Sequence, residues 1–237
     1  MFCPDCDARL DEVAVWEACP QCGGYRRSAN AEAQTAEALG SARDPRAVGR
    51  SVIGGSTQTN VQSVGWRTSA SINAGNSRQE FEGQPPCNED DVEGVCGVLR
   101  EALHQRGEDW GRFSVPRETD HVDAVAENGP NRLLVQVVRV EQRVWGELGR
   151  NGNAEQDSTT SDLAQYILIA VLAKAGKYPE VLKRELLLAL DSVRAPAYAE
   201  HDVIEEFHLN YASQAAMHGY RAVWLVGPTA ASTYQLF

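Results

Sequence analysis

The most strongly β-forming stretch of the chain reads Leu133-Leu134-Val135-Gln136-Val137-Val138-Arg139-Val140. β-Branched residues pack well on a pleated surface, and the turn sequence at 127–131 bounds this run on its N-terminal side. The run therefore predicts a buried strand over 133–140. Gln136 lies inside it, where an amide group without hydrogen-bond partners is costly to bury.

The segments on either side of this strand predict helices and further strands. Apolar residues recur at helical spacing from Val92 to Leu103, which indicates a helix over 89–106 with Cys96 in the core. The stretch 185–190 is nearly all aliphatic and indicates a central strand. The remaining predicted elements are strands at 113–115, 121–126, 220–226 and 233–237, and helices at 162–176 (capped by Ser161 or Asp162) and 199–218. This order predicts an α/β fold, a mixed sheet flanked by helices on both faces.

This order of elements resembles the core of the PD-(D/E)xK nuclease superfamily, which has the restriction-endonuclease-like fold. In that family an Asp lies on or just before the second core strand, and a Glu or Gln lies two residues before a Lys on the third. The resemblance places Asp123, or alternatively Asp120, at the first position, Gln136 at the second, and Glu93 as an acidic residue on the first helix. It implies that the carboxylates bind one or two Mg²⁺ ions and that the protein hydrolyses phosphodiesters.

The chain departs from the family pattern at the lysine. Val138 occupies that position, and a valine neither activates water nor carries charge. Lys174 and Lys177, near the end of the helix predicted to follow, are the candidates to replace it.

Each candidate side chain also has a purely structural explanation. Asp120 and Asp123 flank a strand where they can be solvated, and Gln136 can hydrogen-bond within the core. Glu93 belongs to an acidic run at a helix N-terminus, which the helix dipole favours. Asp191 ends the 185–190 strand, where open α/β sheets bind ligands, and it equally suits a turn.

The N-terminus carries four cysteines in two closely spaced pairs. Cys3 and Cys6 form one pair, Cys19 and Cys22 the other, and twelve residues separate them. A two-residue gap directs both sulfurs of a pair at one ion, and four thiolates complete the tetrahedral shell of a structural zinc site. Residues 1–27 therefore resemble a zinc ribbon, a module that often contacts nucleic acid or protein.

The segment 28–86 is rich in Gly, Ser, Thr, Asn and Gln and shows little apolar periodicity. This composition predicts a largely flexible linker between the zinc ribbon and an α/β domain over 87–237.

The net charge of −11 argues against broad, sequence-independent binding to nucleic acid, which needs Lys and Arg to neutralise phosphates. No apolar run is long enough to span a bilayer and no secretory signal is visible, so we expect a cytoplasmic protein without membrane contacts. The sequence favours a metal-dependent nuclease, or a nuclease-derived nucleic-acid-binding protein. The alternative is a catalytically inactive, acidic protein-interaction module docked through its zinc ribbon.

Overall fold

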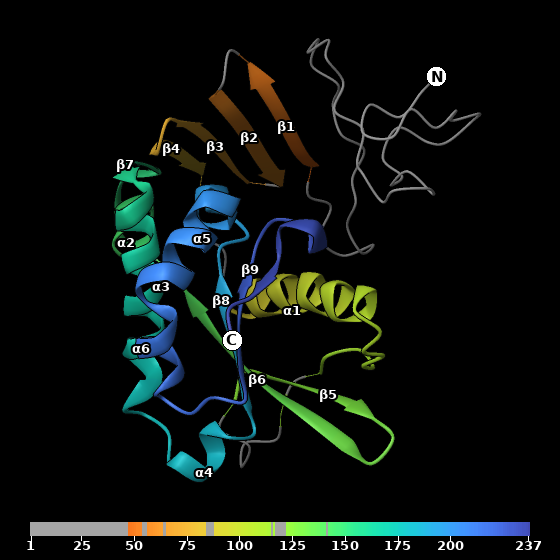
Figure 1. Ribbon diagram of the computed structural model, residues 1–237. Coiled ribbons are helices and arrows are strands. Elements are labelled where there is room, and N and C mark those ends of the chain that lie inside the picture. Colours follow the sequence, from red (N-terminus) through yellow and green to blue (C-terminus); the bar gives the residue numbers. More distant parts are fainter. Residues whose placement is uncertain are drawn as a thin grey trace, which may run out of the picture. The chain divides into compact units, whose positions relative to one another are not determined.

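The computed structural model describes residues 47–53, 56–63, 65–83, 88–114, 116, 122–140 and 142–237 (Figure 1). All of them belong to one compact unit, Thr35–Phe237. The four cysteines predicted to bind zinc, together with Asp120, lie outside the described residues. None of the helices in the described ranges combines the length and the hydropathy needed to cross a bilayer.

The C-terminal half forms a mixed sheet with the strand order β10–β9–β8–β6–β5. Its strands are β5 (Ala124–Asn128), β6 (Asn131–Arg139), β8 (Leu186–Asp191), β9 (Ala222–Val226) and β10 (Tyr234–Gln235). The central strands β6, β8 and β9 are parallel, and β5 and β10 pair antiparallel at the two edges. Every residue of β8 is buried, which confirms its predicted central position.

Helices cover both faces of this sheet, so the predicted α/β class with flanking helices is confirmed (Figure 1). Leu133 and Val135 of β6 pack with α1 (Asn88–Gln105), together with Cys96. Leu134 and Val138 face the other way and pack in the core formed by α2 (Gln142–Asn151), α3 (Thr160–Ala175) and α5 (His201–Asn210). Alternation along β6 therefore places Gln136 on the α3 side.

Three predicted elements differ in detail. Ser114 makes only an isolated bridge to Val125 where a strand was expected at 113–115. The helix expected over 199–218 is divided at Tyr211 into α5 and α6 (Ala212–Ala216). Thr159, rather than Ser161 or Asp162, caps α3, and Asp162 completes a capping box by accepting the Thr159 N–H at 2.9 Å.

A second, antiparallel sheet takes the place of most of the expected linker. Its strand order is β1–β2–β3–β4–β7. The strands are β1 (Ala47–Ile53), β2 (Ser56–Ser63), β3 (Trp66–Asn73), β4 (Asn76–Gly83) and β7 (Asn153–Thr159). The prediction of a flexible linker is therefore wrong for residues 47–83, and β7 comes from a segment to which the sequence analysis assigned no element.

Buried polar contacts connect this second sheet to the loop that follows β8. Gln79 donates to Gln156 at 3.1 Å, and Gln156 donates to the Tyr198 hydroxyl at 3.0 Å. The backbone N–H of Ala197, in the 3₁₀ helix η2 (Pro196–Ala199), donates to the Gln79 side-chain oxygen at 3.2 Å. Because each buried amide has partners, the network fixes the position of the two sheets without the penalty for unpaired polar groups.

Candidate functional site

The candidate site lies where β5 stops short of the end of β6. β5 pairs with residues 131–135 of β6, and no strand in the described part of the chain pairs with the same edge of β6 over 136–139. Asp123 lies directly before β5. Its carboxylate Oδ2 accepts the Val137 backbone N–H at 2.8 Å, in place of a backbone carbonyl from a neighbouring strand. The same oxygen accepts a hydrogen bond from the Gln136 side-chain amide. The two residues singled out from the sequence are therefore in direct contact.

Gln136 is held at both ends of its amide group. Its side chain is only 4% exposed, on the strand position paired with Leu188 of β8. Its Nε2 donates to Asp123, and its Oε1 accepts the hydroxyl of Tyr178 at 2.5 Å. Tyr178 comes from the turn after α3 and was not singled out from the sequence. A partner for the buried amide was predictable, but its identity was set by tertiary packing.

Two tyrosines lie on the α3 side of the site. Burial and the nearby charge of Asp123 raise the pKa of Tyr178. Burial and the neighbouring Tyr178 raise the pKa of Tyr220 to about 12. Both hydroxyls therefore keep their protons at neutral pH. The Tyr220 hydroxyl is buried and has no hydrogen-bond partner within the described ranges.

Replacing Tyr220 with phenylalanine is expected to stabilise the protein by about 1 kcal/mol, because the substitution removes a buried hydroxyl that lacks a partner. The measurement is urea unfolding of the wild type and the Tyr220→Phe variant. Tyr178→Phe is the matched control, and it should lose stability because it breaks the bond to Gln136. A clear loss of stability in Tyr220→Phe would show that the hydroxyl does have a partner.

Glu93 lies on α1, the helix that covers the opposite face of the sheet from Gln136. It is exposed there and accepts a hydrogen bond from Arg112 at 3.0 Å. The expectation that Glu93 joins Asp123 in one metal site stays a prediction.

Neither candidate lysine replaces the missing one. Lys174 and Lys177 make no side-chain hydrogen bond to Asp123 or Gln136 in the described part of the chain, and Lys177 is exposed. Val138, at the family's lysine position, is 3% exposed within the core. The polar group that does reach this face of β6 is the Tyr178 hydroxyl.

The donor atoms at the site are oxygens, which suit a hard cation such as Mg²⁺. The second carboxylate oxygen of Asp123, Oδ1, makes no hydrogen bond to the described part of the chain and is available as a ligand. No group of three or more His, Cys, Asp or Glu side chains converges within the described ranges. A cation here would have one carboxylate from the described residues, and Mg²⁺ commonly keeps several waters in such sites.

A separate charged cluster lies at the carboxyl ends of β6 and β8. Asp91, in the first turn of α1, forms ion pairs with Arg139 and with Arg194, the latter at 3.4 Å. Arg194 also stacks on Trp66 of β3, 4.3 Å from the ring centroid. Asp191 is fully buried beside them, and its Oδ1 accepts the Val193 N–H at 3.0 Å. These groups neutralise one another and join both sheets, which indicates a structural role.

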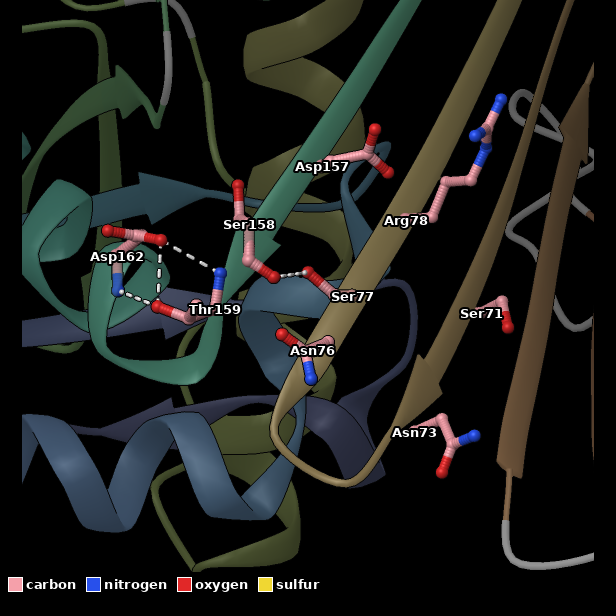
Figure 2. Close-up of a pocket in the computed structure, with 9 residues that line it drawn as sticks. All are labelled: Ser71, Asn73, Asn76, Ser77, Arg78, Asp157, Ser158, Thr159 and Asp162. Carbon is pink, nitrogen blue, oxygen red and sulfur yellow. Dashed lines mark hydrogen bonds between the residues drawn. The ribbon is translucent and has the colours of Figure 1, made fainter.

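A shallow polar hollow of about 520 Å³ lies at one end of the antiparallel sheet (Figure 2). Its lining includes Arg78 and the capping box of Thr159 and Asp162. Arg78 is already engaged by Glu80 at 3.1 Å and Glu155 at 2.7 Å. Since Arg78 and the capping groups are used internally, the hollow offers no assembled set of ligand-binding groups.

No family model, curated protein or solved structure matches this chain. A functional assignment therefore depends on its own residues. Within the described ranges, the contacts of Gln136 with Asp123 and Tyr178 bring a carboxylate, an amide and a hydroxyl together.

Proposed function

We propose that this chain is a divalent-metal-dependent nuclease with a restriction-endonuclease-like C-terminal domain. The observation that supports the proposal best is the contact between Asp123 and Gln136 next to the first residue of β5. Such a contact between the Asp before the second core strand and the Gln on the third is what the family resemblance requires.

The strand arrangement supports this proposal. After α1, the bridge at Ser114, β5 and β6 run antiparallel in turn, and β8 and β9 then follow parallel to β6. This is the succession of a helix, a three-stranded meander and strand–helix–strand units on which the resemblance was based. β7 and α2, inserted between β6 and α3, leave that succession intact.

In the proposed mechanism, Asp123 would hold Mg²⁺ while its Oδ2 stays fixed by the Val137 N–H. Such an ion would supply Lewis-acid polarisation of the phosphate and a more acidic bound water. Gln136 is buried and orients the carboxylate by donating a hydrogen bond to it. The described residues therefore contribute one carboxylate, one orienting amide and one hydroxyl.

The N-terminal four-cysteine segment is proposed to bind one structural Zn²⁺ and to help engage the nucleic acid. The overall charge of −11 means that such contacts are local. Zinc content of the purified protein, compared with that of a Cys3→Ser/Cys6→Ser variant, tests this part. A one-to-one zinc stoichiometry lost in the variant supports it, and equal zinc content in both contradicts it.

The test of the proposed function is cleavage of single- and double-stranded DNA and RNA with Mg²⁺ or Mn²⁺. Asp123→Asn should reduce cleavage by about a hundredfold or more, because it removes the ligand charge while its amide oxygen still accepts the Val137 N–H. Glu93→Gln is the matched control and should cleave like the wild type, since Glu93 is exposed on α1 and engaged by Arg112. Equal cleavage by the wild type and Asp123→Asn would remove Asp123 from the mechanism.

The second candidate function is a catalytically inactive, acidic protein-interaction module. The buried Val138 at the lysine position and the hydrogen bond that Glu93 accepts from Arg112 favour it. A folded, zinc-loaded wild type that cleaves none of the four substrates would select this function over the nuclease.

A further inference from the structure

We propose that Tyr178 is a catalytic residue that takes the place of the family's lysine. This inference rests on the proposed nuclease function. The lysine position is filled by Val138, which is buried in the core on the α3 side of β6. On that same side, the Tyr178 hydroxyl reaches Gln136, two residues earlier on the strand.

The placement of Tyr178 suits a group that meets substrate. The Tyr178 side chain is only partly buried, whereas Gln136, which its hydroxyl contacts at 2.5 Å, is 4% exposed. Gln136 in turn contacts Asp123, so the hydroxyl is one residue removed from the carboxylate that would bind the cation. A tyrosine hydroxyl is a hydrogen-bond donor at neutral pH.

The proposed step is hydrolysis of a phosphodiester by water. The water oxygen forms a bond to phosphorus, the bond from phosphorus to the leaving sugar oxygen breaks, and that oxygen takes up the proton released by the water. Tyr178 gives up no proton. Its O–H donates to a non-bridging phosphate oxygen, where negative charge increases as the bond to water forms. This donation does for the transition state part of what a lysine ammonium does.

Donation to substrate requires the hydroxyl to leave Gln136 or to share its hydrogen. Gln136 retains the contact to Asp123 and its weaker bond to the Val137 carbonyl at 3.3 Å during that exchange. The exchange therefore leaves the carboxylate held in place. Tyr220, the neighbouring tyrosine, has a buried hydroxyl without a partner and makes no contact with Gln136 in the described ranges, so it provides a matched control.

The experiment compares the wild type, Tyr178→Phe and Tyr220→Phe in steady-state cleavage, using the nucleic acid that the wild type cleaves best. Mn²⁺ affinity is measured on the same proteins by electron paramagnetic resonance. We expect Tyr178→Phe to lower kcat by about 10²- to 10³-fold, with KM and Mn²⁺ affinity changed less than threefold. Tyr220→Phe should keep wild-type kcat.

Other outcomes overturn the inference in distinguishable ways. If Tyr178→Phe had the wild-type kcat, the tyrosine would have no catalytic role, and the nuclease proposal would be unaffected. Loss of Mn²⁺ affinity or of folding in parallel with kcat would assign Tyr178 a structural role instead. A wild type without cleavage would end both proposals together.

Discussion

Replacing Val138 with lysine is expected to destabilise the protein by about 4 to 7 kcal/mol without increasing the rate of the proposed cleavage. A fully buried lysine loses three to five pKa units, and each unit corresponds to about 1.4 kcal/mol. Val138 is 3% exposed in a core shared with α2, α3 and α5. The loss approaches the whole stability of an ordinary domain, which is about 5–15 kcal/mol.

The matched control for Val138→Lys is Val138→Met, which adds a chain of similar length without charge. Overpacking alone should cost about 1–3 kcal/mol. Chemical unfolding of the three proteins separates the charge from the added volume. A Val138→Lys protein that is as stable as Val138→Met and cleaves faster than the wild type would show that this position opens to solvent and that the family lysine can be restored.

The second sheet shows why part of the fold escaped prediction. Strands of a half-buried sheet are recognised by alternating apolar residues. In β1–β4 and β7 the inward positions are largely small or polar. Buried and exposed residues therefore alternate along these strands without a clear alternation of apolar and polar side chains. The buried polar residues of this sheet are Thr59, Thr68, Ser77, Gln79 and Gln156. β7, whose sequence is Asn-Ala-Glu-Gln-Asp-Ser-Thr, is a strand because β4 pairs with it.

The central strands were predictable because a strand buried on both faces requires apolar residues at nearly every position. β6 and β8 are aliphatic on both faces, as strands covered by helices on both sides must be. The contact between Asp123 and Gln136 could also be predicted from the sequence, because a turn at 127–131 pairs the strand before it with the strand after it. Tyr178 and the pairing of Glu93 with Arg112 depend on how α3 and α1 pack, which no local pattern encodes.

Replacing Asp191 with asparagine is expected to stabilise the protein by up to about 3 kcal/mol at pH 8. Burial, and then the charge of Asp91, raise the pKa of Asp191 to about 6, against an ordinary value of 3.8. These effects outweigh the Val193 N–H and the two arginines, which act in the opposite direction. A difference of about two pKa units corresponds to about 3 kcal/mol. The asparagine oxygen can still accept the Val193 N–H.

The sign of the pH dependence follows from the raised pKa. Between pH 4 and 6 the folded protein binds the Asp191 proton more tightly than the unfolded chain does. The contribution of Asp191 to the free energy of unfolding of the wild type therefore falls as pH rises through this range. Above about pH 6 the penalty is complete and constant. The stability gained by Asp191→Asn should therefore be small near pH 4, grow up to pH 6 and then level off.

Urea unfolding of the wild type and Asp191→Asn at several pH values between 4 and 8 measures this difference directly. Asp91→Asn is the contrasting variant. It should destabilise by about 3–5 kcal/mol at pH 8, because it leaves Arg139 and Arg194 without the carboxylate that lies between them. If Asp191→Asn instead lost stability above pH 6, the arginines would dominate the Asp191 environment, and the cluster would need both carboxylates ionised to connect the two sheets.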